Sequence, residues 1–307
     1  MSGLKGWVSQ IQHGSVGDGP GLRTTVFLSG CSLRCGWCHN PETWEQLPKL
    51  MFFPALCSHC GVCAQVCPES AHLLEGDSHR ILRDRCGGPQ NTPCGRCAAL
   101  CPSSALRLSA CGMTVGQVME EVQQDRDFYL CSGGGVTLSG GEPLLQPAFC
   151  AALAQACCYE EISVLLDTAG DVPWSSFQQV IPYIKQVYYD IKTACQEDCR
   201  RYTGGNYQQI LDNLSRILQE TCSVTVRIPL IPGVNWEEDT LLQIGETLCK
   251  LGVREVSLLP FHRLGSSKYA ALDMEYSFSS CPPPEKKEIE YRRKLLAGLG
   301  LSVWIGG

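Results

Sequence analysis

The chain has few of the features that mark membrane, secreted or nucleic-acid-binding proteins. No apolar run in its 307 residues is long enough to span a bilayer, and residues 1–6 lead into polar sequence without the hydrophobic region of a secretory signal. Basic residues number 25 against 31 acidic ones, which gives a net charge of −6. Such a charge disfavours nucleic acid or an anionic membrane as the main partner. We therefore expect a cytoplasmic protein that binds neither.

What the chain has in excess is cysteine, with 21 residues. The reducing cytosol disfavours disulfides. Eleven of the cysteines fall between Cys31 and Cys101, in groups of three, four and four with the spacings of metal ligands. The other ten are scattered from Cys111 onward. Five of these lie among apolar neighbours and are expected to be small core residues: Cys150, Cys157, Cys158, Cys222 and Cys249.

The first cysteine group is a tight loop with the pattern CxxxCxxC, formed by Cys31, Cys35 and Cys38 after an apolar run at residues 24–28. A [4Fe–4S] cluster takes one thiolate per iron. Three cysteines would leave one iron open, and an open metal position is where a substrate or cofactor can bind. The alternative is a structural zinc loop with His39 as fourth ligand. Zinc sites usually have two separated CxxC pairs, so we favour the iron–sulfur interpretation.

The other two groups lie in residues 48–108, which are interrupted by prolines and have little apolar periodicity. A segment with so small a core needs cross-links. Cys57 to Pro68 is the C-x2-C-x2-C-x3-C-P run of bacterial ferredoxins, and a second run extends from Cys86 to Pro102 with a longer first gap. In two-cluster ferredoxins the fourth cysteine of each run ligates the other cluster. One [4Fe–4S] cluster is therefore assigned to Cys57, Cys60, Cys63 and Cys101, and the other to Cys67, Cys86, Cys94 and Cys97. A zinc ribbon is the alternative, but the Cys–Pro ends favour iron–sulfur.

The remainder of the chain alternates between strand and helix patterns. Seven runs are expected as strands: residues 24–28, 136–138, 164–166, 187–189, 224–228, 256–259 and 303–305. Six segments are expected as helices, with Thr114, Asn206 and Asn235 as caps: residues 114–126, 144–158, 177–183, 207–220, 237–251 and 285–299. Repeated βα units imply a parallel sheet. Six or seven units fall short of a closed eightfold barrel.

We therefore predict an α/β fold, a partial, open (β/α)6-type barrel with an inserted ferredoxin-like domain. Residues 1–47 would begin the barrel, residues 48–108 would form the insertion and residues 109–307 would complete the barrel. Polar side chains follow the ends of the predicted strands, where barrel sites assemble. Singly, each could be a turn, a helix cap, a surface charge or a core histidine. Together they indicate one site: Gly140, Gly141, Glu142, Asp167, Thr168, Asp190, Lys192, Arg227 and His262.

The Cys31–Cys38 loop, with Trp37 before its last cysteine, resembles the CxxxCxxC loop of the radical S-adenosylmethionine (SAM) enzymes. Residues 18–23, DGPGLR, and residues 38–44, CHNPETW, are similar to segments of the glycyl radical enzyme activating enzymes within that superfamily. The resemblance covers essentially the whole chain. The insertion resembles that of the longer, three-cluster activases, which serve dehydratases, decarboxylases and C–N or C–S lyases.

The resemblance also implies roles for individual residues. Ser139 to Pro143 is similar to the loop that takes the amino group of SAM. Asp18, Gly19 and Gly21 resemble the loop that meets the partner's glycine segment. The other implied SAM contacts, some of which bind a monovalent cation in certain members, are Trp37, Asp167, Thr168, Asp190, Lys192, Arg227 and His262 with the segment after it.

The implied activity is that of an oxidoreductase with three [4Fe–4S] clusters. SAM would be cleaved reductively to methionine and a 5′-deoxyadenosyl radical, which takes a hydrogen atom from a backbone glycine of a glycyl radical enzyme. The implied electron donor is a flavodoxin or a ferredoxin, and the chemistry requires no side chain as general base. Three alternatives remain at this point: a radical SAM enzyme that modifies another peptide or small molecule, a ferredoxin-like electron carrier, and a zinc-held interaction module.

Overall fold

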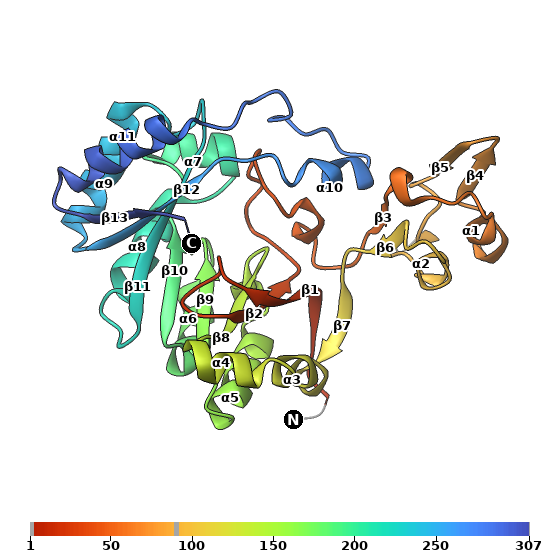
Figure 1. The fold of residues 1–307 in the computed structure, drawn as a ribbon, viewed down its shortest axis with the longest axis horizontal. Helices are drawn as coiled ribbons and strands as arrows, with labels where there is room; N and C mark the ends of the chain where they lie inside the picture. The colour runs from red at the N-terminus through yellow and green to blue at the C-terminus, as the bar shows by residue number, and fades with distance from the viewer. Residues whose placement is uncertain (1–2, 89–91, 307) are drawn as a thin grey trace.

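The computed structural model describes residues 3–88 and 92–306, and its largest element is a nine-stranded sheet (Figure 1). The seven strands β2 and β8 to β13 are each parallel to their neighbours among these seven, whereas β1 pairs antiparallel with both β2 and β7 at one edge. The strands in their order across the sheet are β13 (Ser302–Ile305), β12 (Glu255–Pro260), β11 (Ser223–Leu230), β10 (Gln186–Asp190), β9 (Ser163–Thr168), β8 (Gly135–Gly140), β2 (Arg23–Leu28), β1 (Lys5–Ser15) and β7 (Cys111–Thr114).

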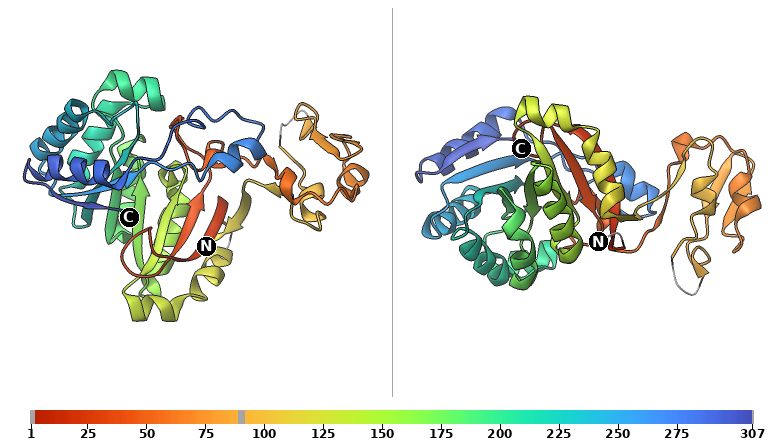
Figure 2. Two further views of the ribbon diagram at one scale, coloured as in Figure 1. Left: turned by 45° about the horizontal axis from the view of Figure 1, so that its top comes forward. Right: turned by 90° about the horizontal axis from the view of Figure 1, so that it is seen from below.

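Helices connect the parallel strands and lie on the outer, convex face of the curved sheet (Figure 2). They are α3 (Val115–Gln123), α4 (Arg126–Ser132), α5 (Pro147–Tyr159), α6 (Trp174–Val180), α7 (Gln196–Thr203), α8 (Tyr207–Ile217), α9 (Glu238–Lys250) and α11 (Lys286–Ala297). The short helix α10 (Ser266–Ala271) lies instead on the side that faces the insertion, against residues 41–43 and 50–52 (Figure 1). Short 3-10 turns add η1 (Pro41–Thr43), η2 (Pro54–Leu56), η4 (Pro143–Leu145) and η5 (Ile181–Tyr183). The main core is formed by the apolar faces of these helices against fully buried strand residues such as Val136, Leu138 and Val226.

The sheet has two edges, β13 and β7, so it does not close on itself. The predicted partial, open barrel is therefore confirmed, and all seven predicted strands are present. The sequence did not predict β1 and β7. Most of the second half of β1 is exposed, and β7 is a four-residue strand with no buried residue, so neither has the apolar signal of a core strand.

The helix predictions were correct in place but not in every detail. The helix expected over residues 114–126 is α3, which ends at Gln123, and a second helix that was not predicted, α4, begins at Arg126. Thr114 and Asn206 cap α3 and α8, because each side chain accepts a backbone N–H of the first turn. The prediction for Asn235 was wrong, since the residue before α9 is Glu237. The core assignment of the scattered cysteines was correct for Cys150 and Cys157, which are buried, and wrong for Cys158 and Cys249, which are exposed.

The insertion lies beside the barrel as a small unit (Figure 1). Its first and last strands pair with each other, so the chain leaves and re-enters the barrel at adjacent points. It contains β3 (Leu50–Phe52), α1 (Val62–Val66), β4 (His72–Glu75), β5 (Ser78–Ile81), α2 (Arg96–Ala99) and β6 (Leu106–Leu108). In the described part of the chain its buried apolar core is Leu50, Phe52, Cys63, Ile81, Cys97, Ala105 and Leu106. Part of the long gap in the second cysteine run, residues 89–91, lies outside the described residues.

The insertion is joined to the barrel by Arg83. Its Nε donates to the Asp273 carboxylate over 2.8 Å, and its guanidinium donates to the Ala271 carbonyl over 3.0 Å. The same guanidinium donates to the Leu50 carbonyl within the insertion. Across residues 3–88 and 92–306, no helix combines the length and the apolar content needed to cross a membrane.

Candidate functional site

A cavity of about 450 Å³ opens at the carboxyl ends of the parallel strands. Most of the residues predicted from the sequence line it: Asp18, Cys31, Cys35, Trp37, Cys38, Gly140, Gly141, Asp167, Thr168, Asp190, Lys192, Arg227 and His262. Gly19, Gly21 and Glu142 are not among its lining residues. The sequence patterns therefore identified the residues that meet at this edge of the sheet, although they are separated by up to about 240 positions along the chain.

The cysteine loop lies on one wall of this cavity. Its backbone is fixed to the end of α7, where Arg34 N donates to Thr203 O over 2.7 Å, and Asn40 N donates to Cys38 Sγ over 3.4 Å. Burial raises the pKa of the Cys31 thiol to about 12 and that of the Cys35 thiol further. A bound metal deprotonates its cysteine ligands outright. Three cysteines on the wall of one cavity therefore suit a metal centre better than free thiols.

His39 is engaged away from the cysteines. Its Nε2 lies 2.9 Å from the His262 carbonyl oxygen, and the two imidazole rings stack with their centroids 3.9 Å apart. Burial, with His262 beside it, lowers the pKa of His39 to about 4. This contact occupies Nε2 alone, so a zinc ligand from His39 would have to be Nδ1.

The paired glycines at the end of β8 allow the segment that leads into the cysteine loop to pass at backbone contact. Gly140 has φ +121°, and a Cβ there would lie 2.3 Å from the backbone of Leu28. A Cβ on Gly141 would lie 2.2 Å from Gly30 O. We expected the glycines to admit a ligand. On the side where a Cβ would project, the backbone that approaches is the chain's own, just before Cys31, so any other residue would displace the cysteine loop.

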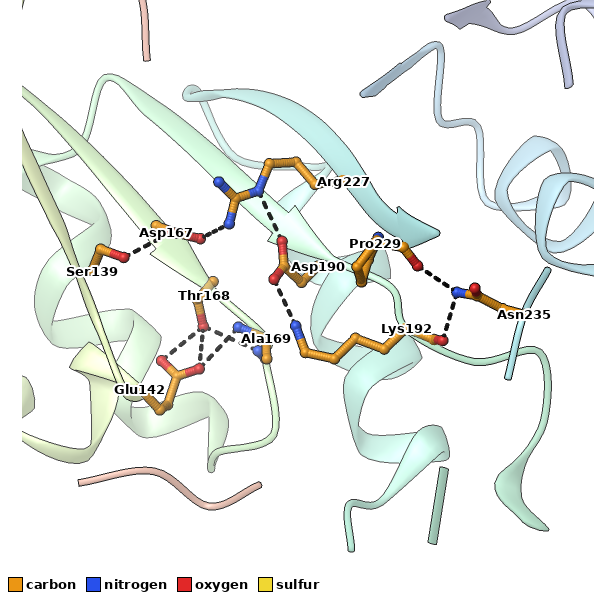
Figure 3. Close-up of polar contacts among 11 residues, drawn as sticks. Ser139, Glu142, Asp167, Thr168, Ala169, Asp190, Lys192, Arg227, Pro229 and Asn235 are labelled. Atoms are coloured by element: carbon orange, nitrogen blue, oxygen red, sulfur yellow. Dashed lines mark hydrogen bonds and ion pairs between the residues drawn. The ribbon is translucent and has the colours of Figure 1, made fainter. Parts of the chain in front are cut away.

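Glu142 has a different position from the one we expected. Its side chain is fully buried, and both carboxylate oxygens accept the Thr168 hydroxyl, at 2.8 and 2.9 Å. The same carboxylate accepts the N–H group of Ala169 (Figure 3) and that of Leu144. Burial outweighs these bonds and raises the pKa of Glu142 to about 7. Glu142 therefore holds the Thr168–Ala169 turn in place and is not one of the charges facing the cavity.

Four charged side chains form a continuous network across three strand ends (Figure 3). The Arg227 guanidinium bridges two carboxylates, with Nε 2.8 Å from Asp190 Oδ1 and another nitrogen bonded to Asp167. Lys192 Nζ donates to Asp190 Oδ2 over 2.6 Å, and Ser139 Oγ donates to Asp167 over 2.7 Å. The two acids and two bases neutralise one another. All four carboxylate oxygens are engaged.

The electrostatics follow from this pairing. Burial would raise the pKa of Asp190, but Arg227 and Lys192 together lower it to about 2. Asp167 faces only one of these cations, and burial raises its pKa. The pKa of Lys192 is raised because Asp190 outweighs the effect of burial. Lys192 uses one of the three donors of its ammonium on Asp190, so further donors remain for a ligand in the cavity.

Asn235 was missed as a site residue. Its buried side-chain Oδ1 accepts Ile231 N over 2.8 Å, and its Nδ2 donates to the carbonyls of Pro229 and Lys192 over 2.7 and 3.0 Å. One amide thus joins the end of β11 to the loop after β10 (Figure 3). The position close to a helix start suggested a cap, and nothing in the local sequence distinguishes the two roles.

The segment from His262 onward packs on the residues that follow the cysteine loop. Lys268 Nζ donates to Asn40 Oδ1 over 2.7 Å and to the buried Glu42 carboxylate over 2.5 Å. A Cβ on Gly265 would lie 2.9 Å from His39 Cα. Of the late motif expected to contact SAM, only His262 lines the cavity, and Lys268 instead holds the cysteine loop from behind.

The loop between β1 and β2 carries Asp18, Gly19 and Gly21. Asp18 reaches the cavity, and its Oδ2 accepts the hydroxyls of Ser15 and Thr25 over 2.5 and 2.7 Å. Gly19 and Gly21 have φ +136° and +72° and make close backbone packing instead; a Cβ on Gly21 would lie 2.5 Å from Gly134 N. The two glycines therefore shape the turn that presents Asp18.

The insertion brings its cysteines together in two groups of four. One cavity is lined by Cys57, Cys60, Cys63 and Cys101, and a second by Cys67, Cys86, Cys94 and Cys97. These are the two sets expected from the ferredoxin pattern, including the exchange of the fourth cysteine. Gly61 and Gly95, with φ +77° and +74°, precede equivalent helices α1 and α2. His59, between Cys57 and Cys60, is exposed.

Comparison with known proteins adds a second line of evidence. A model described as the radical SAM superfamily matches residues 107–244, and one described as a 4Fe–4S single cluster domain matches residues 17–77. The (2S)-3-sulfopropanediol dehydratase activating enzyme of Klebsiella oxytoca is 40% identical over 286 residues, which cover 90% of this chain and 88% of that one. The isethionate sulfite-lyase activating enzyme of Oleidesulfovibrio alaskensis is 41% identical over 274 residues, 86% of each chain.

Among solved structures, Streptococcus suis SuiB bound to precursor peptide SuiA superposes with a TM-score of 0.52 over 92% of this chain and 48% of that one, at 12% identity. A likeness at that identity supports the fold alone.

Proposed function

Since the chain belongs to the glycyl radical enzyme activating enzymes of the radical SAM superfamily, we propose that it binds SAM against a [4Fe–4S] cluster in the 450 Å³ cavity and uses it to generate a glycyl radical on a partner enzyme. The observation that carries the proposal is the meeting of three cysteines, of which Cys35 is buried and Cys31 and Cys38 are half-buried, with the Asp167–Arg227–Asp190–Lys192 network in one cavity.

Cys31, Cys35 and Cys38 would hold the cluster, with three protein ligands for its four irons. Lys192, with donors to spare, suits the SAM carboxylate, and the backbone after β8 at Gly140 and Gly141 suits its ammonium. Trp37 supplies a buried aromatic surface on the cavity wall. Because both oxygens of Asp167 and of Asp190 are engaged, we include no monovalent cation in the proposal.

When bound, the cluster and SAM together supply the one-electron cleavage that gives methionine and a 5′-deoxyadenosyl radical, which takes a hydrogen atom from a backbone glycine. The chain's own contribution is positioning and exclusion of water. The Glu142–Thr168 contact fixes the turn after β9, and Asn235 fixes the ends of β10 and β11, so the cavity walls are set before a ligand binds.

Asp18 is proposed to meet the partner's glycine segment. One of its carboxylate oxygens is occupied by Ser15 and Thr25, and the other is available to accept the amide of an extended peptide. The neighbouring glycines give the turn its conformation and need not touch the peptide. The open edge between β13 and β7 gives a large partner access that a closed barrel would not.

The insertion, residues 48–108, is proposed to carry two further [4Fe–4S] clusters, bringing the total to three. A cavity of about 600 Å³ lies between the barrel and the insertion, and it is lined by Glu42 and Trp44 on one side and by Cys86 and Pro93 on the other. The four-cysteine set that contains Cys86 therefore lies nearer the barrel. We propose that electrons from a flavodoxin or ferredoxin enter at the Cys57 set, pass to the Cys86 set and then reach the barrel.

Changing Cys31, Cys35 and Cys38 together to Ala tests the central site. The reconstituted triple variant should lose about four of about twelve irons per chain and should form no 5′-deoxyadenosine from SAM and dithionite. The matched control changes the three exposed cysteines Cys131, Cys158 and Cys249 to Ala, and should retain both the iron and the cleavage. SAM cleavage by the first variant would show that the radical chemistry does not use this loop.

A further inference from the structure

Two histidines of the insertion lie between its two four-cysteine cavities. His79 on β5 lines the cavity of the Cys57 set, which would hold the first insertion cluster. His72 on β4 lines the cavity of the Cys86 set, which would hold the second. The hairpin register pairs His72 with Ile81 and Leu74 with His79, so the two histidines are diagonal neighbours on one face. Their rings are joined directly, with His72 Nδ1 3.0 Å from His79 Nε2.

The two remaining ring nitrogens point away from the shared bond. His79 Nδ1 lies 3.6 Å from Cys57 Sγ, within reach of a hydrogen bond to sulfur. His79 Nε2 lies 3.8 Å from Cys63 Sγ, but its shorter contact is to His72. His72 Nε2 is buried and has no protein partner among the described residues. A buried polar atom without a partner is costly, and this one belongs to a side chain on the wall of the second cavity.

The number of N–H groups in this pair is fixed by its chemistry. Two neutral imidazoles carry two N–H groups in total, and one of them makes the bond between the rings. If His79 Nε2 is the donor in that bond, the other N–H is on His72 Nε2. If His72 Nδ1 is the donor, the other N–H is on His79 Nδ1. The pair therefore has one N–H outside the shared bond, either on His79 Nδ1 beside Cys57 or on the buried His72 Nε2, but never on both.

We propose that His72 and His79 form a hydrogen-bonded pair that joins the two insertion clusters and shares one N–H donor between them. Hydrogen bonds to the sulfurs are one of the factors that set the potential of an iron–sulfur cluster, because a donor stabilises the added negative charge of the reduced state. A switch of tautomer gives the donor to one cluster and withdraws it from the other. The pair thereby links the two potentials. This inference rests on the two-cluster assignment proposed above.

The test uses the full-length, reconstituted protein and two single variants, His72→Phe and His79→Phe, which keep an aromatic ring in each place. In His72→Phe the lone His79 keeps its N–H for the first cluster, and the second cluster loses its donor. In His79→Phe the reverse holds. The cluster potentials are measured by redox titration followed by electron paramagnetic resonance. The potential of the second cluster should fall in His72→Phe, and that of the first cluster should fall in His79→Phe. A tenfold change in a one-electron equilibrium corresponds to a fall of about 59 mV. The other insertion potential should stay or rise.

His59→Asn is the matched control, since His59 is exposed in the first cysteine run and has φ +53°, which Asn tolerates. It should leave both insertion potentials unchanged. Three results at unchanged iron content would overturn the proposal that the pair shares one donor. They are a fall of the same cluster's potential in both variants, a fall of both potentials in one variant, and no shift in either variant. A shortage of iron in the unmodified protein would instead refute the two-cluster assignment.

If both variants fail to hold their iron, the unmodified protein labelled with 15N-histidine tests whether these histidines contact the insertion clusters. Pulsed resonance of the reduced clusters should then detect histidine nitrogen coupled to the insertion clusters. Absence of that coupling would overturn the proposal.

Discussion

The Arg227 guanidinium lies 2.8 Å from Asp190 through its Nε and bonds Asp167 through another nitrogen, so one buried cation joins two strands of the barrel mouth. Only arginine offers two donors in a rigid planar fork at this reach. Because the carboxylates are desolvated, their charges depend on this partner. The relationship leads to the first prediction.

Arg227→Met should destabilise the protein by about 3–5 kcal/mol, because it leaves a buried carboxylate uncompensated. The double variant Arg227→Met with Asp167→Leu should cost less than the sum of the two single changes, since the pair is removed together. Anaerobic urea unfolding measures both. Arg216→Met is the control, because Arg216 is exposed and only contacts the Trp174 ring. Strictly additive costs would show that the bridge is not energetically coupled.

Glu142 predicts a pH dependence of stability. Burial raises its folded pKa to about 7, above the ordinary 4.5, so the folded state binds this proton more tightly than the unfolded state does. Stability should therefore fall as pH rises from about 4.5 to about 7 and level off above that. In Glu142→Gln this contribution should vanish. The amide also leaves one backbone N–H without an acceptor, at a cost of about 1–3 kcal/mol.

Melting temperatures measured without oxygen between pH 5.5 and 8 test this. Glu160→Gln serves as the control, because Glu160 pairs with Arg126 at the surface. A pH slope that persists in Glu142→Gln would assign it to another group.

Asn235→Asp should weaken SAM binding and lower stability by about 1–3 kcal/mol, because a carboxylate cannot donate to the carbonyls of Lys192 and Pro229. Asn206→Asp is a matched control, since Asn206 is a helix cap and Asp caps equally well. Equilibrium binding of SAM to the reconstituted protein gives the first quantity and thermal unfolding the second. Equal behaviour of the two variants would remove Asn235 from the positioning of Lys192.

The insertion predicts a separation of binding from electron supply. Cys60→Ala with Cys94→Ala removes one proposed ligand from each insertion cluster and should leave SAM binding intact. It should slow turnover with a flavodoxin or ferredoxin donor and expose the segment to protease, because little apolar core remains to hold it. Unchanged turnover together with an unchanged digestion pattern would contradict both the relay and the structural role.

The sequence predicted the parts of the fold that local chemistry determines. The parallel strands have continuous apolar runs, and the polar residues at their ends are brought together by the right-handed crossovers of a parallel sheet. The cysteine spacing predicted which sulfurs meet in the insertion. These inferences needed only residue type and spacing.

What the sequence did not show depends on three-dimensional context. The charges of Asp190 and Lys192 were expected to face a ligand, yet Asp190 pairs with both Lys192 and Arg227. Glu142 could not be recognised as fully buried, because the turn after β9 that encloses it comes from residues 26 positions later. Nor does any sequence pattern show that His72 lines one four-cysteine cavity and His79 the other. Each of these depends on a distant neighbour.

The central claim is that this protein makes a glycyl radical on a partner. Reduced, reconstituted protein, SAM and a candidate partner enzyme with a glycine loop should be mixed without oxygen and examined by electron paramagnetic resonance. The account predicts a protein-centred doublet whose main splitting collapses when the partner carries glycine deuterated at Cα, with deuterium recovered in 5′-deoxyadenosine. SAM cleavage accompanied by a radical on a small molecule or another peptide, with none on any glycine of the matched partner, would contradict it.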